Sequence, residues 1–364
     1  MRGKQADKLF LGIVSILLVA GFLIFTSASL GLLARTGASF SSVALNQGVA
    51  LVIGCAIAFV ASKIRYTFWR RWSFYIFLVS IFVTLLVFFP KIGLEFGGGK
   101  RWIALGPVTL QPAEFLKIAA VIYCAALLAA AKDRVGTFRG GMMPVILLLS
   151  VVGAILLKQP DTDTFISIFL AAMSMFIVAG GRFRHLFALC LISLVGFAVL
   201  VFMRPYLMQR ISTFLNPSAD PQGAGYQIQQ SLIAIGSGET FGRGFGQSIQ
   251  KFSYLPEPIG DSIFVVAAEE FGFVGGTALI VLFLFFTLRG FRIAARSPDT
   301  FGGLLVTGIV ILIVSGSFMN IASMLGVMPL SGLPLLFVSH GGSAMMFTLF
   351  QVGIILNISK FRKT

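Results

Sequence analysis

Ten long apolar runs follow one another along the chain and limit the folds that are open to it. A bilayer core needs roughly 20 apolar residues of helix, and a water-soluble domain has no use for so many such runs. Segments of about ten residues with alternating apolar and polar side chains, which a membrane β-barrel requires, are missing from the sequence. The sequence therefore predicts an all-α integral membrane protein with about ten transmembrane helices in a single domain, residues 1–364. The runs span residues 9–33, 43–61, 73–90, 115–131, 142–157, 165–180, 186–203, 263–288, 302–322 and 342–358.

The charged residues are divided unevenly among the segments between these runs. The chain has 28 Lys and Arg residues against 13 Asp and Glu, a net charge of +15. If the N-terminus is cytoplasmic, the inner segments hold 18 basic residues and three acids, and the remaining ten basic and ten acidic residues cancel. An excess of Lys and Arg inside is typical of membrane proteins, so we expect both termini in the cytoplasm and no nucleic acid partner. The inner basic residues are Arg2, Lys4, Lys8, Lys63, Arg65, Arg70, Arg71, Lys132, Arg134, Arg139, Arg182, Arg184, Arg289, Arg292, Arg296, Lys360, Arg362 and Lys363.

Three segments on the opposite side are too long, or too rich in glycine and proline, to be simple connections. They are residues 91–114, 204–262 and 323–341. Irregular backbone at membrane depth is stable only when it is buried in protein or lines a wet cavity. Long loops in a compact domain are usually functional. We therefore expect the working face outside the cell, with a large extracytoplasmic loop over 204–262 between the seventh and eighth helices. Parts of this loop have the apolar spacing of short interfacial helices.

Ionisable side chains near or inside apolar runs are costly and often functional. Glu114 and Lys117 stand three residues apart at the start of a helix, so they can pair on one face. Glu269 and Glu270 fall inside the eighth run. A structural network of ion pairs and a role in a functional site both remain open for these residues.

Asp261 has a different setting. It follows Pro256, Pro258 and Gly260, at the end of a rigidly turned loop that opens into a helix. A carboxylate at this position either caps the helix or acts as a water-facing base at a membrane-embedded cleft. The residues alone leave both roles open.

Other motifs do not support a different chemistry. The four glycines of "GETFGRGFGQS" follow no strand and lack the lysine of a phosphate loop, so we expect no nucleotide and no organic cofactor. The stretch "SIQK" matches the S-x-x-K of penicillin-binding enzymes without its companion motifs. With two histidines, and three cysteines that all lie in apolar runs, a histidine-based metal site or a Ser-His-Asp triad is hard to assemble.

Four long stretches resemble one family. "GGGKRWIALGPVTLQPAEFLK", "GAGYQIQQSLIAIGSGETFGRGFGQSIQKFSYLPE", "AEEFGFVG" and "GVMPLSGLPLLFVSHGGSA" are similar to the SEDS family of shape, elongation, division and sporulation proteins, which includes FtsW, RodA and SpoVE. The resemblance covers almost the whole chain and is nearer to the FtsW division type, through "GQSIQKFSYLPE". The chain departs from the family pattern at Ile259 and Gly260, where His-Thr is usual, and at His340, where Tyr is usual.

The resemblance implies an enzyme, a peptidoglycan glycosyltransferase that polymerises lipid II with inversion on the outer face of the bacterial cytoplasmic membrane. The family's essential aspartate falls on Asp261, which would be the catalytic general base. The departing pyrophosphate needs positive charge, which the outer loops can supply. A divalent cation, Mg²⁺ or Mn²⁺, held with the pyrophosphate by Asp261 or Glu114, is compatible with this chemistry, although no ligand spacing requires one. The residues expected to bind substrate are Lys100, Arg101, Glu114, Lys117, Arg210, Gln230, Arg243, Lys251, Ser339 and Ser343.

Two other functions stay open at this point. A lipid II flippase would also contain buried charges and broken helices, although the charged groups here gather on one side and no inverted repeat is visible. A non-catalytic scaffold of the wall-synthesis machinery is the third reading. As partners, the resemblance implies a class B penicillin-binding protein with transpeptidase activity, and proteins of the division or elongation complex. Small residues of the ninth run would let a partner helix approach closely, or serve packing within the bundle: Gly302, Gly303, Gly308 and Gly316.

Overall fold

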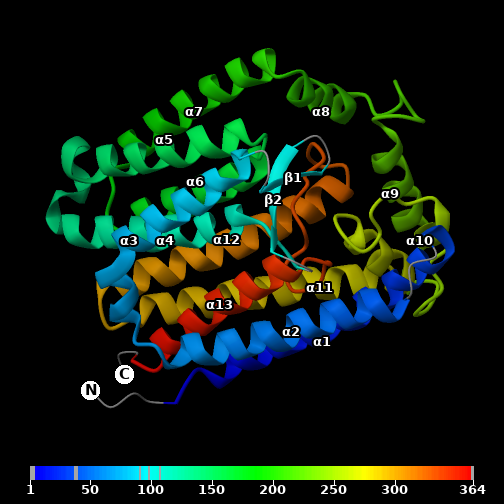
Figure 1. Cartoon of the computed structure of the whole chain (residues 1–364), viewed down its shortest axis with the longest axis horizontal. Helices are drawn as coiled ribbons and strands as arrows, with labels where there is room; N and C mark the ends of the chain where they lie inside the picture. Colours follow the sequence, from blue (N-terminus) through cyan, green and yellow to red (C-terminus); the bar gives the residue numbers. More distant parts are fainter. Residues whose placement is uncertain (1–4, 37–39, 90–91, 97–98, 106–107, 362–364) are drawn as a thin grey trace.

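The computed structural model describes residues 5–36, 40–89, 92–96, 99–105 and 108–361, and its long helices form one bundle (Figure 1). Among the described residues, nine helices are long and apolar enough to cross a membrane, and a tenth, α6, is shorter at 17 residues. Each of the ten coincides with one predicted apolar run, so the predicted multi-pass helical fold is confirmed. The ten helices are α1 (Lys8–Thr36), α2 (Phe40–Lys63), α3 (Tyr66–Leu85), α4 (Pro112–Ala131), α5 (Met143–Lys158), α6 (Thr162–Val178), α7 (Phe183–Met203), α11 (Ile263–Ala295), α12 (Thr300–Met324) and α13 (Gly342–Ser359).

Helix α12 forms the centre of the bundle. It packs against α4, α6 and α11, and 83% of its membrane-length window is buried inside the protein. One of the glycines expected on its surface is used in this packing: a Cβ on Gly308 would stand 2.6 Å from side-chain atoms of Val121 and Met175, whereas a Cβ on Gly316 would meet nothing nearer than Leu333 at 3.9 Å. Packing within the bundle, and not a partner helix, therefore explains Gly308. Helix α7 is the opposite case, because only 11% of its window is buried and it lies along the outside of the bundle (Figure 1).

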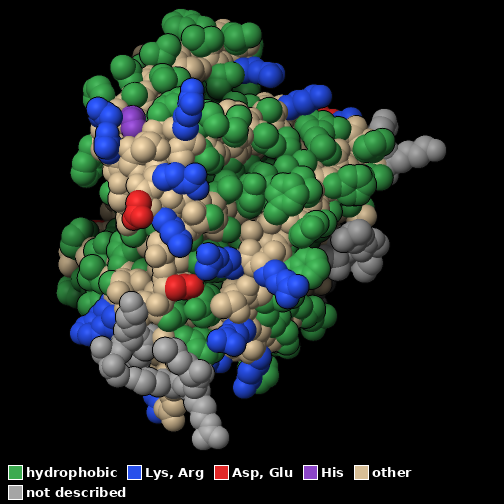
Figure 2. Space-filling view, turned by 90° about the vertical axis from the view of Figure 1, so that its left-hand side faces the viewer, with side chains coloured by type: hydrophobic (Ala, Val, Ile, Leu, Met, Phe, Trp, Pro, Cys, Tyr) green, Lys and Arg blue, Asp and Glu red, His purple; other side chains and the backbone are tan. Residues whose placement is uncertain are grey.

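The end of the bundle near both termini is basic. The described members of the inner basic set lie on the connections and helix ends gathered there, and Figure 2 shows this face with many Lys and Arg side chains and few acids. The buried acid Asp7 connects several helices at this end. Arg289 donates two hydrogen bonds to the Asp7 carboxylate, at 2.9 and 2.6 Å. The backbone N–H of Asp7 also donates to the hydroxyl of Ser359. Helices α1, α11 and α13 are thereby joined at one point. The connection between α4 and α5 consists of a 3₁₀ turn (Lys132–Gly136) and a π-helical turn (Phe138–Met142).

A small antiparallel sheet lies toward the other end, in a segment for which the sequence predicted irregular backbone. Its strands are β1 (Gly93–Phe96), β2 (Gly99–Leu105) and β3 (Val108–Leu110), in the order β1-β2-β3, and a 3₁₀ turn (Leu86–Phe88) precedes it. Strands of four, seven and three residues are too short to show a clear alternation in the sequence. Arg101 on β2 fixes the sheet to the bundle by donating hydrogen bonds to the carbonyls of Gln159 and Pro160, between α5 and α6.

The long loop over 204–262 contains α8 (Pro205–Leu215), α9 (Tyr226–Ser237) and the short α10 (Gln250–Ser253). The two short helices expected there are α8 and α9, and α9 packs against α11 of the bundle. A turn rich in glycine follows α9 and packs against α11 where that helix is broken at Gly272, with φ 66° and ψ −164°. The N–H groups of Phe273 and Val274, which the break deprives of helical partners, donate to the carbonyls of Glu239 and Thr240. The glycine-rich stretch therefore serves close packing of backbone on backbone.

Candidate functional site

A cavity of about 600 Å³ lies beside the sheet, where the loop over 204–262 meets the segment between α12 and α13. Its walls come from four parts of the chain: α2, the sheet, the end of the long loop and the start of α13. The cavity contains two carboxylates, Glu257 and Asp261, one imidazole, His340, and the indole of Trp102. The α2 wall is mostly apolar, with Val49, Ala50 and Ile53 beside Asn46, and Val49 and Ile53 are about half exposed. The cavity thus combines ionisable groups with apolar side chains of a membrane-length helix.

Asp261 does not cap the helix that follows it. The N-cap position of α11 belongs to Ser262, whose hydroxyl accepts a hydrogen bond from Nε2 of Gln227 at 3.2 Å. Within the described part of the chain, no hydrogen bond reaches the Asp261 carboxylate, which is partly exposed to the cavity. Of the two roles that the sequence left open, the structure therefore favours a carboxylate available to a ligand.

Hydrogen bonds from Asn320, Ser339 and His340 hold the backbone around Asp261 in place. Asn320, fully buried on α12, donates from Nδ2 to the carbonyl of Asp261 at 2.7 Å and to the carbonyl of Leu333 at 2.8 Å. Ser339 donates from Oγ to the carbonyl of Gly260 at 2.8 Å, and the N–H of His340 donates to the carbonyl of Ile259 at 2.7 Å. These bonds fix two loops against each other and hold the carboxylate at the cavity.

Sequence reasoning missed Asn320. Its signal was present, because it is an amide inside an otherwise apolar run, where a polar side chain needs a buried partner.

The surroundings of Asp261 raise its pKa from 3.8 to about 6. Removal of the carboxylate from water is the largest cause, and the negative charges of Glu257 and Asp163 add to it. Arg210 and Arg101 oppose these effects by stabilising the ionised form. The carboxylate is therefore largely ionised at neutral pH, and it is a stronger base than an aspartate in water.

Arg210 on α8 stands beside this carboxylate. Its Nη1 lies 3.0 Å from Oδ2 of Asp163 on α6, and the same oxygen accepts from the N–H of Gly332. A Cβ on Gly332 would lie about 4 Å from Arg210 Nη2, Asp163 Oδ2 and Asp261 Oδ2 alike (3.9, 4.0 and 4.0 Å). The guanidinium and both carboxylates thus surround one glycine, and Arg210 is the expected substrate-binding cation that the structure brings nearest to Asp261.

Two further cations expected near the pyrophosphate, Arg101 and Lys100, lie on β2. Arg101 is close enough to Asp261 to act on it electrostatically, since it lowers the pKa of both Asp161 and Asp261. Burial raises the pKa of Asp161 in spite of this, and Asp161 caps α6 by accepting a hydrogen bond from the N–H of Thr164. Lys100 is exposed on β2, next to Arg101. An exposed cation is accessible to an anion, and contact of Lys100 and Arg101 with substrate stays a prediction.

Glu114 and Lys117 form the predicted pair. Lys117 Nζ lies 2.7 Å from Glu114 Oε1 in the first turns of α4, and both side chains are buried. A buried pair of this kind is costly to break because each charge would be left without its partner. The pairing is confirmed, and contact of these residues with substrate stays a prediction.

The structure gives Lys251 a different place from the one expected. Lys251 is fully buried, and its ammonium donates to Glu270 at 2.6 Å, Ser27 at 2.9 Å and the carbonyl of Gly246 at 2.9 Å. All three of its donors are therefore used, and none remains for a pyrophosphate. Arg243 lies 3.7 Å from Glu269 and is exposed, so its contact with substrate stays a prediction. Glu269 and Glu270 thus belong to a structural ion-pair network, one of the two roles left open for them.

The three uncharged residues expected to bind substrate are placed differently from one another. Gln230 is half-buried on α9. Ser339 is buried next to Asp261, and its hydroxyl donates a hydrogen bond to the backbone carbonyl of Gly260. Ser343 is buried in the first turn of α13, and within the described chain its hydroxyl has no hydrogen-bond partner. Their contact with substrate remains a prediction.

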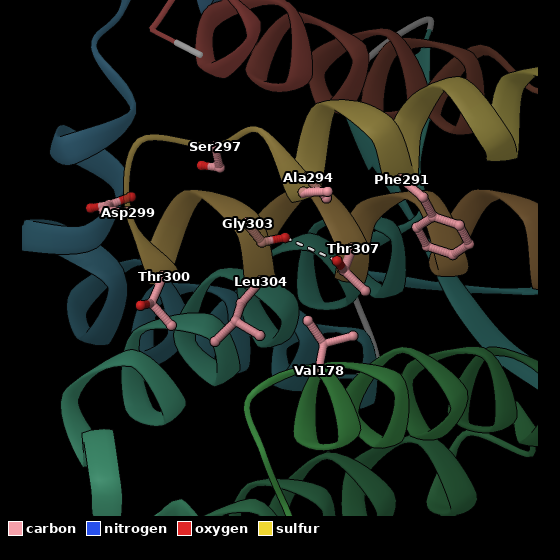
Figure 3. Close-up of a pocket in the computed structure, with 10 residues that line it drawn as sticks. Val178, Phe291, Ala294, Ser297, Asp299, Thr300, Gly303, Leu304 and Thr307 are labelled. Carbon is pink, nitrogen blue, oxygen red and sulfur yellow. Dashed lines mark hydrogen bonds between the residues drawn. The ribbon is translucent and has the colours of Figure 1, made fainter. Parts of the chain in front are cut away.

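A second cavity, of about 460 Å³, lies at the basic end between α6, α11 and α12 (Figure 3). Its polar groups mostly serve the helix ends: Asp299 caps α12 by accepting from the N–H of Gly302, and Thr307 donates to the carbonyl of Gly303. Asp299 is the one ionisable residue in its lining. Over the residues that the structure describes, no group of three or more His, Cys, Asp or Glu side chains is arranged to hold a metal ion. Of the two cavities, the one with Asp261 has more ionisable side chains in its lining, since it holds Glu257 and His340 as well.

Comparison with known proteins links this arrangement to one family. The family model of the FtsW, RodA and SpoVE cell cycle proteins matches residues 7–364. Stage V sporulation protein E of Bacillus subtilis is 39% identical over 311 residues, which is 85% of this chain and of that protein. A protein of Geobacter sulfurreducens, named probable peptidoglycan glycosyltransferase FtsW, is 42% identical over 314 residues, 86% of this chain and 84% of its own.

Two solved structures have a similar fold. A chain from work described as "Structural coordination of polymerization and crosslinking by a peptidoglycan synthase complex" superimposes with a TM-score of 0.80, at 26% identity over 97% of both chains. The rod shape determining protein RodA of Thermus thermophilus superimposes with a TM-score of 0.72, at 24% identity over 99% of this chain and 98% of RodA.

Proposed function

The chain belongs to the family of FtsW, RodA and SpoVE cell cycle proteins, and we infer that it is a peptidoglycan glycosyltransferase that polymerises lipid II into glycan strands. The observation that carries this proposal is the carboxylate of Asp261, held at a cavity, free of described hydrogen bonds and raised in pKa to about 6. An inverting glycosyl transfer needs one such base. A relative 42% identical to this chain is named for the same activity.

The proposed reaction joins two lipid-linked sugars. Lipid II carries a disaccharide-peptide on undecaprenyl pyrophosphate. The 4-hydroxyl of one sugar attacks the anomeric carbon of the other, its proton passes to Asp261, and the bond from that carbon to the pyrophosphate oxygen breaks. The pyrophosphate leaves with the electron pair and with inversion at the carbon. Asp261 supplies the base.

Arginine side chains stabilise the leaving group in this scheme. Arg210 and Arg101 are the cations closest to Asp261 in electrostatic terms, and a guanidinium fork suits phosphate oxygens. Arg210 is already held by Asp163, so little ordering is required when the substrate arrives. The apolar α2 wall with Val49 and Ile53 gives the lipid carrier a path from the bilayer to the cavity.

The same scheme fixes the orientation in the bacterial cytoplasmic membrane. We place both termini and the basic end in the cytoplasm, and the cavity with Asp261 at the outer surface. The gathering of Lys and Arg residues at one end supports this orientation. It also puts the acid-lined cavity on the side where the cell wall is built.

A cross-linking partner follows from the same proposal, because glycan strands without peptide cross-links cannot carry tension. We propose a class B penicillin-binding protein, working within the division or elongation machinery. A similar chain comes from a structure described as a peptidoglycan synthase complex that coordinates polymerization and crosslinking. The expected result is co-purification of the two chains on co-expression. Failure of every such transpeptidase of the same cell to co-purify would count against the partnership.

Purified protein incubated with lipid II tests the activity directly. We expect a ladder of glycan strands on a gel from the wild type and none from Asp261→Asn, because the amide keeps the side-chain shape and cannot take a proton. Asp220→Asn is the matched control, since Asp220 is an exposed aspartate of the same loop and is not part of the cavity lining. A ladder from Asp261→Asn at the wild-type rate would refute the base. No ladder from the wild type, in the presence of its partner as well, would leave the flippase and scaffold functions.

A further inference from the structure

We propose that His340 determines acceptor specificity: its imidazole, as a neutral Nε2–H donor, hydrogen bonds the sugar hydroxyl that Asp261 deprotonates. This inference rests on the proposed glycosyl transfer and assigns a second contact to the same hydroxyl.

His340 lines the cavity together with Asp261 and Glu257, although it lies about 80 residues further along the chain. The backbone N–H of His340 donates to the carbonyl of Ile259, two residues before Asp261. The adjacent Ser339 bonds the carbonyl of Gly260. The imidazole and the carboxylate are thus mounted on two loop segments that are hydrogen bonded to each other, so their relative position is set by backbone.

The plane of the His340 ring is set by α1. The imidazole stacks on the ring of Phe25, with the ring centres 5.7 Å apart and the planes at 17°. Phe25 is fully buried in the core, so it is a rigid support. A side chain fixed both at its backbone and at its ring pays little conformational entropy when it contacts a ligand.

The ring nitrogens have different surroundings. Nδ1 of His340 is buried and, within the described chain, has no hydrogen-bond partner. An N–H at that position would be a buried donor without an acceptor, which is costly. The proton of the neutral ring therefore belongs on Nε2, at the other edge of the ring. Nε2–H is the donor that this histidine can offer to the cavity.

The charge state of His340 agrees with this role. Burial lowers the pKa of the imidazole from 6.5, and the carboxylate of Glu257 only partly opposes the change. Glu257 and Asp261 are the titratable groups that share its cavity. The ring is therefore neutral at pH 7 and does not compete with Asp261 for the proton.

A sugar hydroxyl between His340 and Asp261 would find a donor for its oxygen and an acceptor for its hydrogen. Its oxygen accepts from Nε2–H of His340, and its hydrogen points to the carboxylate of Asp261. Both neighbours together select the hydroxyl whose oxygen and hydrogen lie in the right directions. A sugar without a hydroxyl at that carbon, or with one of the opposite configuration, leaves a buried donor without a partner.

Three substitutions of His340 distinguish the effect of losing the Nε2–H donor from the effect of losing the ring that stacks on Phe25. His340→Phe keeps the stack on Phe25 and removes the donor. His340→Gln carries an amide N–H near the position of Nε2, and His340→Asn carries one near Nδ1. We expect kcat/KM for lipid II to fall about 10-fold in the Phe and Asn variants, the loss of about one neutral hydrogen bond, and to stay within about threefold of wild type in the Gln variant. Melting temperatures in detergent show which variants are folded, and the Gln–Asn pair carries the test if Phe does not fold.

The pH profile shows whether Asp261 remains the base when His340 is changed. We expect the acid limb of kcat/KM, set by Asp261, to stay at the same pH in His340→Phe, because the substitution leaves that carboxylate in place. The difference between the Gln and Asn variants is the readout that a merely structural role of the ring would not produce. Wild-type activity in both the Phe and Asn variants would overturn the inference. Equal losses in folded Gln and Asn variants would also overturn it. A wild-type protein that forms no glycan would instead overturn the proposed function, and this inference with it.

Discussion

Asp261 combines desolvation with freedom from hydrogen bonds, two conditions that most buried carboxylates do not share. Two other buried acids are paired with cations: Glu114 with Lys117, and Glu270 with Lys251. Burial raises the pKa of Asp161 as well, but that side chain serves as the cap of α6. Asp261 instead faces a cavity, has two further acids in its neighbourhood and is opposed by arginines that stand to one side. An unfavourable charge that is exposed to a cavity is common at functional sites.

The pH dependence of activity follows from that charge. Asp261 must be ionised to accept a proton, and its pKa is raised to about 6. We expect the polymerisation rate to be level above about pH 7 and to fall as the pH drops through 6, by about tenfold for each pH unit below it. Initial rates of strand formation between pH 4.5 and 8 check this. A rate that stays constant down to pH 4.5 would mean that another group is the base.

The raised pKa of Asp261, which favours activity as the pH rises, lowers the stability of the folded protein over the same range. The folded pKa lies above the ordinary 3.8, so between these two values the folded state binds more protons than the unfolded state. The free energy of unfolding should therefore decrease as the pH rises from about 4 to about 6, and remain constant above. At neutral pH, Asp261→Asn removes this penalty and should stabilise the protein by about 1–3 kcal/mol. Thermal melting of both proteins at pH 7.5 measures this, and a destabilised Asn variant would contradict it.

Sequence reasoning recovered those residues of the site whose signals are local. The Glu114–Lys117 pair follows from a spacing of three along a helix. The position of Asp261 between a turned loop and a helix start drew attention to it but left a cap and a base both open, and only the family resemblance implied the base. Lys251 could not be placed in this way, because its partners Ser27 and Glu270 lie 224 and 19 residues away. An exposed basic loop and a buried ion pair look alike in a sequence until the fold brings the acid to the base.

Among the elements, α11 depends most on a single residue. Gly272 has backbone angles that are essentially restricted to glycine, and a Cβ there would stand 2.3 Å from the backbone nitrogen of Gly242. Gly272→Ala should therefore destabilise the protein by about 3 kcal/mol or more, from strain and overpacking together. Gly276→Ala, one turn further on, is the control: its nearest neighbour is at 3.7 Å, and a gain of up to about 1 kcal/mol is expected. Similar melting temperatures for the two variants would argue against the kink.

The helices were predictable as elements because the apolar runs are close to the length that a bilayer requires and follow one another along the whole chain. The sheet was not, since β1, β2 and β3 span only four, seven and three residues. The position of α12 at the centre was also not predictable: glycines that allow close approach look the same whether the neighbour is another helix of the bundle or a partner chain. Only the contacts of Gly308 with Val121 and Met175 decide between them.

At the scale of the whole molecule, the two ends of the bundle have different chemistry. One end gathers Lys and Arg residues and both chain termini (Figures 1 and 2). The other carries the sheet, the long loop and the cavity with Asp261. A membrane separates a cytoplasm that supplies lipid-linked precursors from a surface where the wall is assembled. A protein built with these two ends suits the proposed transfer only if its basic end is inside.

Cysteine labelling tests this orientation. In a variant without Cys55, Cys124 and Cys190, a single cysteine at Ser218 in the long loop or at Thr137 between α4 and α5 gives one exposed thiol at either end. Because the inner basic set includes the residues around Thr137, we expect a membrane-impermeant thiol reagent to label Ser218→Cys in intact cells and Thr137→Cys only after the membrane is opened. Opening the membrane controls for accessibility, since both positions must then react. Labelling of Thr137→Cys in intact cells, with Ser218→Cys protected, would invert the protein, move Asp261 to the cytoplasmic side and exclude polymerisation at the outer surface.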